Sequence, residues 1–469
     1  MLLLPWRKFF WIYAFFTPLG ASAHAFGQSF TLPLPVWLYL YGAGAAVVVS
    51  FLVIALFSSR KEHSLAYKEY DLSRTGINFF LRNRALLHGI KFLSLFVFVV
   101  TLLSAIEGNT SPTDNFASIF IWIVFYLGFT YLSALLGNFW PVVNPYKILT
   151  SFWNYKPAIT YPSWLGFFPA LLFYYMFVWG ELLSGGAWAN PHNLFLIIVS
   201  YCALTFIGIV FVGREAWFQY ADFFSVFFKL LSKISPLEYH EGKVLLRAPF
   251  IGLVRGEAEH FSLVIFILFM LASTAFDGFR ETTTWGSFYK LYVAHGASLG
   301  ESGWVLASSF ALACAPFIFL FFYWSAIVLM KVLLGSRESV QLLMRRFAFS
   351  LIPIALAYNI AHYYTLLLVE GQQIIALASD PFEKGWNIFH TANFVPNIGI
   401  VGATFVWNSQ VAVILLGHIA SVYLAHRIAL HEFPSRKQAI ISQVPMLFLM
   451  VLYTVFGLWI LSQPMSVGV

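Results

Sequence analysis

The chain has 469 residues, of which 60% are hydrophobic and only 10% are charged. Soluble globular proteins carry about 25% charged residues, so this composition excludes a soluble protein. The formal net charge of +7 does not indicate nucleic-acid binding, because the basic residues are spread over several loops instead of massed on one face. The two cysteines, Cys202 and Cys314, each lie in an apolar stretch, which excludes a disulfide framework and a thiolate metal site.

The N-terminus has the pattern of a secretory signal peptide. Arg7 and Lys8 precede the apolar stretch "FFWIYAFFTPLG", and "ASAHA" follows with small residues at Ala21 and Ala23. This arrangement predicts a signal peptide over residues 1–23, with cleavage after Ala23. The mature chain would then begin at His24. An uncleaved first membrane span is the alternative.

The remaining chain consists of apolar blocks about 20 residues long, the length with which an α-helix crosses a ~30 Å hydrocarbon core. The period-two alternation of outer-membrane barrels is absent. We therefore predict an all-α, polytopic helical membrane protein with one domain over residues 24–469. The ten predicted spans cover residues 33–57, 88–106, 117–137, 164–184, 193–213, 258–277, 304–334, 347–369, 408–428 and 441–462.

Lys and Arg gather in every second loop. Loops 58–87, 214–257, 335–346 and 429–440 are basic, whereas the loops between them are nearly free of Lys and Arg. Because basic loops stay on the cytoplasmic side, we predict a bacterial cytoplasmic (inner) membrane protein with both mature termini in the periplasm.

One segment of the second basic loop predicts a helix that lies along the membrane surface. In "WFQYADFFSVFFKLLSK", residues 217–233, polar residues recur every three or four positions and leave a Phe-rich remainder. This spacing is typical of an amphipathic interfacial helix. The polar positions are Gln219, Asp222, Ser225, Lys229 and Lys233.

Two histidines lie inside predicted spans, where ionisable groups are costly and mark candidate functional sites. His362, in "AYNIAHYY", is about eight residues from the outer end of its span, and His418 is about ten residues from the outer end of the next. At ~1.5 Å per residue, their depths differ by about 3 Å. The pair could therefore meet between neighbouring helices, with Asn359 on the same helix face as His362 to orient its imidazole.

Further polar residues gather towards the same side of the membrane. Imidazoles and carboxylates together are the ligands of divalent metals such as zinc or copper, and they also form proton relays. We predict His362, His418 and His24 as metal ligands and Glu181 or Asp277 as catalytic base or third ligand. The other polar residues predicted to line the site are Asn359, Gln410, Glu107 and Glu370. The alternatives are hydrogen bonds between helices for the histidines, an interfacial position for the carboxylates, and an Asp277–Arg280 pair.

Several stretches resemble a bacterial polytopic membrane-protein family commonly labelled fenitrothion hydrolase. These are "AHAFGQSFTLPLPVWLYLYGAGAAVVVSF", "GNFWPVVNPYK", "GREAWFQYADFFSVFF", "STAFDGFRE", "IPIALAYNIAHYY" and "GHIASVYLAHRIAL". The resemblance extends along almost the whole chain. It implies the same membrane fold and, by the label, hydrolysis of an organophosphate triester, but it identifies no catalytic residues.

Three functions fit these observations. The first is a membrane hydrolase for organophosphates or esters, in which a metal-bound water attacks the substrate on the periplasmic side. The second is a transporter or permease for a metal ion or small solute, with the same residues along its path. The third is a redox subunit that binds haem or quinone through His362 and His418. The lipid bilayer is the predicted partner in all three.

Overall fold

The computed structural model describes residues 22–25, 28–31, 34–57, 68–72, 83–152, 156–240, 243–294 and 300–463. Only Ser22 and Ala23 of the predicted signal peptide fall within these residues, and only as backbone, so the signal peptide stays a prediction. The side chain of His24 also lies outside the described residues.

The prediction of an all-α polytopic membrane protein is confirmed. The described residues form ten helices that are long and apolar enough to cross a membrane. Three of these ten spans are built from consecutive segments. Most of the ten extend a few residues beyond the predicted block at one end or at both ends. The spanning helices are α2 (Val36–Phe57), α4 (Arg84–Glu107), α5 (Phe116–Ile119) with η5 (Phe120–Gly128) and α6 (Phe129–Leu136), η7 (Ser163–Leu165) with α9 (Phe168–Leu183), α10 (Pro191–Val212), α14 (Phe261–Arg280), α16 (Gly300–Leu334), α17 (Val340–Phe347) with η9 (Ala348–Leu351), α18 (Ile352–Val369), η10 (Glu370–Gln373) and α19 (Ile374–Leu377), α20 (Ala403–Glu432), and α21 (Arg436–Ser462).

Shorter elements connect these helices. A hairpin pairs β1 with β2, and a small antiparallel sheet has the strand order β3-β5-β4, with Tyr70 opposite Leu246 and Tyr239 opposite Val244. The short elements are β1 (Ser22–Ala25), β2 (Gln28–Thr31), β3 (Tyr70–Asp71), β4 (Leu237–His240), β5 (Lys243–Leu246), η4 (Pro112–Asp114), α7 (Trp140–Val143), α8 (Pro145–Leu149), η6 (Thr150–Phe152), α11 (Arg214–Ala216), η8 (Trp217–Ala221), α12 (Phe223–Ser232), α13 (Ile251–Val254) and α15 (Thr283–Ala294).

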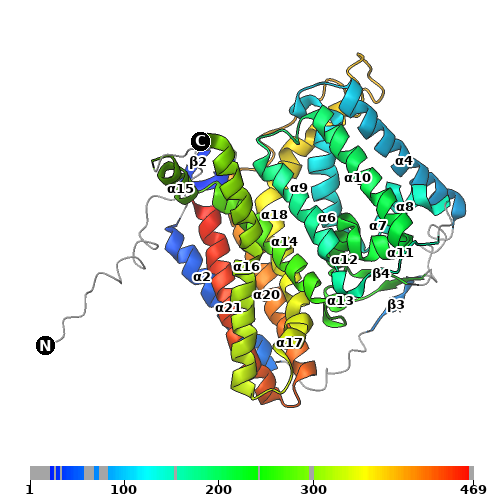
Figure 1. The fold of residues 1–469 in the computed structure, drawn as a ribbon. Coiled ribbons are helices and arrows are strands. Elements are labelled where there is room, and N and C mark those ends of the chain that lie inside the picture. The colour runs from blue at the N-terminus through cyan, green and yellow to red at the C-terminus, as the bar shows by residue number, and fades with distance from the viewer. Residues whose placement is uncertain are drawn as a thin grey trace.

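Helices α14 and α18 form the centre of the molecule (Figure 1). On one side lie α2, α16, α20 and α21, and on the other lie α4, α6, α9, α10 and α12. Helix α14 is buried all round its circumference, since every residue from Ser262 to Gly278 is buried; a largely apolar helix of this kind belongs inside a bundle. By contrast, α4 and α10 bury few residues and turn most of their apolar side chains outward, as lipid-facing helices do. We call the end that holds α15 and Ser462, the last residue of α21, predicted to be periplasmic, the outer end.

Irregular turns interrupt the spans that contain η5 and η9. Segment η5 is a nine-residue π-helix, and η9 is a turn of 3-10 helix just before Pro353. Proline has no backbone N–H and cannot bond the carbonyl four residues earlier, which accounts for η9. No comparable residue explains η5. Non-α turns at membrane depth are found where protein buries the backbone and often lie near functional sites.

The segment predicted as one amphipathic surface helix, 217–233, is divided at Asp222. Residues Trp217–Ala221 form a π-turn, and Asp222 caps α12 by accepting a hydrogen bond from the backbone N–H of Ser225. Eight of the ten residues of α12 are buried, and the helix contacts α6 and α9. Protein therefore covers the Phe-rich face that the interfacial helix would place in lipid.

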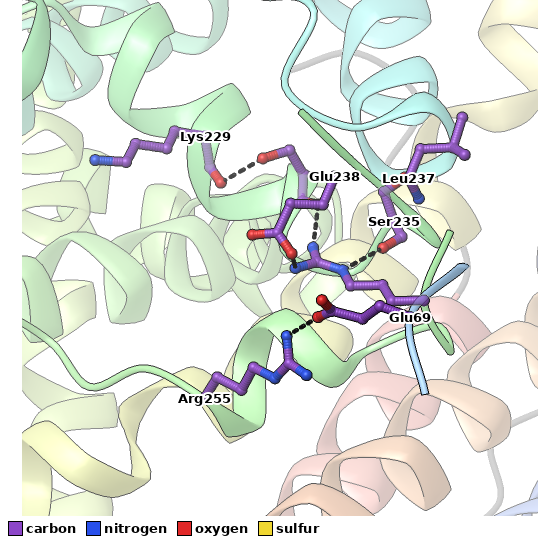
Figure 2. Close-up of polar contacts among 8 residues, drawn as sticks. Glu69, Lys229, Ser235, Leu237, Glu238 and Arg255 are labelled. Atoms are coloured by element: carbon purple, nitrogen blue, oxygen red, sulfur yellow. Dashed lines mark hydrogen bonds and ion pairs between the residues drawn. The ribbon is translucent and has the colours of Figure 1, made fainter. Parts of the chain in front are cut away.

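A buried arginine holds the three-stranded sheet at the inner end. The guanidinium of Arg247 donates to the Glu238 carboxylate at 2.5 Å and to the carbonyls of Ser235 and Ser232 at 3.2 and 3.5 Å (Figure 2). Its side chain is only 5% exposed. Burial lowers the pKa of the Arg247 guanidinium, and the Glu238 carboxylate acts in the opposite direction. A second ion pair joins Arg255 to Glu69 (Figure 2).

We expect Arg247→Met to lower the free energy of unfolding by about 2 kcal/mol, because two carbonyls and one carboxylate lose their donor. Denaturant-induced unfolding in detergent would measure the change. The matched control is Arg255→Met, which breaks the more exposed pair and should cost less than about 1 kcal/mol. Equal losses in the two variants would contradict a special role for Arg247.

Candidate functional site

A buried acid–imidazole pair joins the two central helices near the outer end. His362 of α18 donates from Nε2 to the Asp277 carboxylate of α14 at 2.9 Å, and the hydroxyl of Tyr363 donates to the same oxygen at 2.7 Å. The His362 and Asp277 side chains are 10% and 7% exposed. A buried ion pair is stable only when its hydrogen bonds are made, and the Asp277 carboxylate here accepts two.

The geometry of two helices brings these groups together. Asp277 and Arg280 are three residues apart on α14 and form an ion pair at 3.6 Å, as i,i+3 neighbours on one helix face do. Arg280 also donates to the carbonyl of Leu182 near the end of α9. The alternative predicted for Asp277, pairing with Arg280, is therefore confirmed. Asp277 therefore interacts with His362 and Tyr363 of α18 and with Arg280 of its own helix, α14.

Two further carboxylates lie within electrostatic reach of the pair. Glu181, in the last turn of α9, interacts with Asp277, His362 and Arg280. It has no hydrogen bond or ion pair within the described residues. Glu281, just beyond the end of α14, also interacts with this group; its burial, and then the Asp277 charge, raise the pKa of its carboxyl. The site thus holds three carboxylates against one guanidinium and one imidazole, so it attracts protons or cations.

The structure places His418 elsewhere. Its Nδ1 lies 2.8 Å from the carbonyl of Ile414, one turn earlier on α20, and its Nε2 has no partner. The ring is 3% exposed and borders an apolar cavity. His362 and His418 share no hydrogen bond in the described part of the chain. His362 and His418 therefore have separate hydrogen-bond partners, and the structure does not bring the predicted pair together.

The remaining predicted residues have separate surroundings. Asn359 is buried, but it does not bond His362; the orienting partner is Asp277. Gln410 donates to the carbonyl of Ala361 and so joins α20 to α18. Glu107 and Glu370 are exposed, and Glu107 pairs with Lys384 at 3.8 Å. Of the predicted residues, then, Asp277, His362 and Glu181 come together.

Two contributors were not predicted as site residues: Tyr363 and Tyr358. Tyr363 follows His362 directly in the sequence. Its side chain is oriented so that its hydroxyl donates a hydrogen bond to the Asp277 carboxylate. Tyr358 lies one turn before His362 on α18, the spacing at which side chains share a face. It is 4% exposed, and its hydroxyl has no partner.

The described residues contain no group of three His, Cys, Asp or Glu side chains arranged to hold a metal ion. The metal site predicted around His362 and His418 is not formed by these side chains, because the two imidazoles face different neighbours. No family model, curated protein or solved structure matches the chain. The chemistry of the site is accordingly argued from its geometry.

Proposed function

We propose that the protein is a proton-coupled transporter of the bacterial inner membrane, in which the Asp277–His362 pair takes up and releases the coupling proton. The observation that carries this proposal is the position of the pair. It lies between the two central helices, out of water, with the carboxylate of Glu181 beside it. Ionisable groups buried at membrane depth are typical of proton relays in transporters and pumps.

Two further observations support transport. His418 and His426 follow one another on α20 towards the inner end, both are buried, and neither Nε2 has a protein partner. Eight residues of α-helix separate them by about 12 Å. The non-α turns η5 and η9 interrupt two spans, as broken helices do around the binding sites of transporters.

A membrane hydrolase, the activity implied by the family resemblance, is the second candidate. One observation favours it: Asp277 holds Nε2 of His362, whereas Nδ1 has no hydrogen-bond partner among the described residues. A carboxylate that orients an imidazole in this way is the arrangement of a general base. In that case His362 would remove a proton from the water that attacks an ester or a phosphotriester.

The test is proton entry into liposomes that contain the purified protein and the pH-sensitive dye pyranine. A potassium diffusion potential set with valinomycin drives protons inward. We expect faster acidification with wild-type protein than without protein, and loss of that excess in His362→Asn. The control is His192→Asn, at an exposed position of α10, and it should acidify at the wild-type rate.

Wild-type acidification no faster than in empty liposomes, or an unchanged rate in His362→Asn, would contradict the proposal. The hydrolase is tested on the same preparations with diethyl p-nitrophenyl phosphate. Release of p-nitrophenol that depends on His362, without proton entry, would select the second candidate.

A further inference from the structure

Helix α15 lies at the edge of the bundle, beside the outer end of α16 (Figure 1). Its 12 residues make a helix about 18 Å long, too short for the ~30 Å of hydrocarbon that a spanning helix crosses. None of these residues is buried. Helix α15 is therefore outside the packed core, and the direction of each of its sides decides what covers it.

One side of α15 is an aromatic stripe that packs on α16. Trp285, Tyr289 and Tyr292 recur at steps of four and three residues, which places them on one face of a helix. Each contacts the ring of Trp304, with centroid distances of 5.3, 5.1 and 5.6 Å. These contacts fix the rotation of α15 about its own axis.

A polar stripe runs along the opposite side of α15. Thr283, Ser287 and Lys290 repeat the same steps of four and three residues, and all three are exposed. Because successive residues of a helix are about 100° apart, this stripe points away from Trp304. It lies where water or lipid headgroups can form hydrogen bonds with it.

Large apolar side chains are exposed between the two stripes. Phe288 and Leu291 are 49% and 56% exposed, and their spacing of three residues makes them neighbours on one flank of the helix. Val293, which is 52% exposed, is on the other flank. A helix with polar residues along one side and large apolar residues beside them is typical of the membrane interface.

The surroundings of α15 identify lipid as the phase that covers Phe288 and Leu291. Helix α16, on which α15 packs, exposes Leu306 and Phe310 within three turns of its start, by 66% and 71%, so acyl chains are needed at this level. Trp and Tyr, which form the aromatic stripe, are enriched where the membrane meets water. We propose that α15 is an interfacial helix in the outer leaflet, with Phe288 and Leu291 inserted among the acyl chains and the polar stripe at the headgroups.

Lipid contact by α15 would also steady the candidate site. Trp285 contacts the rings of Phe276 and Phe279 on α14, at 5.5 and 5.8 Å, and these two residues flank Asp277 in the sequence. A helix held in the outer leaflet therefore fixes the outer end of α14. This lipid contact is independent of whether the protein transports protons or hydrolyses esters.

Fluorescence quenching in lipid nanodiscs measures which residues of α15 touch lipid. The two native cysteines are removed by Cys202→Ala and Cys314→Ala, and the dye NBD is attached at Phe288→Cys, Leu291→Cys or Val293→Cys. Iodide quenches the dye from water. A phospholipid with a nitroxide near the headgroup end of one acyl chain quenches it from the bilayer.

We expect lipid quenching at Phe288→Cys and Leu291→Cys to be several-fold stronger than at Val293→Cys, and iodide quenching to be several-fold weaker. Val293 is the matched control, because it is as apolar and as exposed as the other two but lies on the opposite flank. Phe310→Cys, on the exposed side of α16, is the reference for a side chain in lipid.

Three results would overturn the inference. Equal iodide quenching at all three positions of α15 would show that the helix stands in water. Protection of Phe288→Cys and Leu291→Cys from both quenchers would show that protein, such as a second copy of the chain, covers this flank. Equal lipid quenching at Val293→Cys and Phe288→Cys would show that the helix is immersed on all sides. None of these results bears on proton entry into liposomes, which tests the proposed function separately.

Discussion

Replacing Asp277 by Asn is expected to abolish potential-driven proton entry. The carboxylate accepts from His362 and Tyr363 and pairs with Arg280, so one substitution removes the negative charge that serves all three. Breaking a buried ion pair from one side leaves the partner charge uncompensated and costs about 3 kcal/mol. We therefore expect the acidification rate to fall to that of empty liposomes, with a clear drop in the free energy of unfolding.

A double-mutant cycle separates the pair from its surroundings. Because Asp277 and His362 act on each other, we expect Asp277→Asn combined with His362→Asn to lose less than the two single losses together, with a coupling energy of about 1–3 kcal/mol. Unfolding in detergent measures the cycle. Glu301→Gln, at an exposed residue in the first turn of α16, serves as the control and should leave both stability and proton entry unchanged. Additive losses would show that the two side chains do not function as a pair.

Depth in the membrane could be read from the sequence, but the direction in which a side chain points could not. Counting residues from the span ends placed His362 and His418 at nearly the same level. Their partners depend on rotation about each helix axis, and in a helix buried on all sides, such as α14, the apolar residues do not show which face meets which neighbour. Asp277 and His362 are 85 residues apart, so no local spacing relates them.

The same limit explains why residues 217–233 were predicted to lie along the membrane surface. A Phe-rich face with polar residues at regular steps indicates that the face avoids water, and both lipid and protein meet that need. In the structure, protein covers α12. The spans themselves were predictable because each contains about 20 apolar residues in a row. Their ends were predicted less well, since helices such as α20 continue past the apolar block through residues that hydropathy does not select.

The local pair Asp277–Arg280 was predictable from its i,i+3 spacing. By contrast, the unpartnered atoms of Tyr358 and His418 could not be identified from the sequence, because a missing partner is a property of the whole environment. The Tyr358 hydroxyl and His418 Nε2 lack partners because of how several helices pack around them, and neither segment shows this on its own.

A close approach of α18 and α20 at Gly417 provides the second large effect. A Cβ on Gly417 of α20 would stand 2.3 Å from the Cβ of Ala357 and 2.9 Å from the carbonyl oxygen of Pro353, both on α18. Small residues at such positions allow the backbones of membrane helices to approach closely. Gly417→Val must push the two helices apart, and we expect it to lower the free energy of unfolding by about 3 kcal/mol.

The matched control is Gly42→Val on α2, because a Cβ at Gly42 would meet nothing within 4 Å; this variant should remain within about 1 kcal/mol of the wild type. In Gly417→Ala, the added methyl meets chiefly the Ala357 methyl, so a second change, Ala357→Gly, should recover part of the lost stability. Failure of this second change to recover any stability would show that the clash with the Pro353 carbonyl, and not the methyl contact, sets the distance between the two helices.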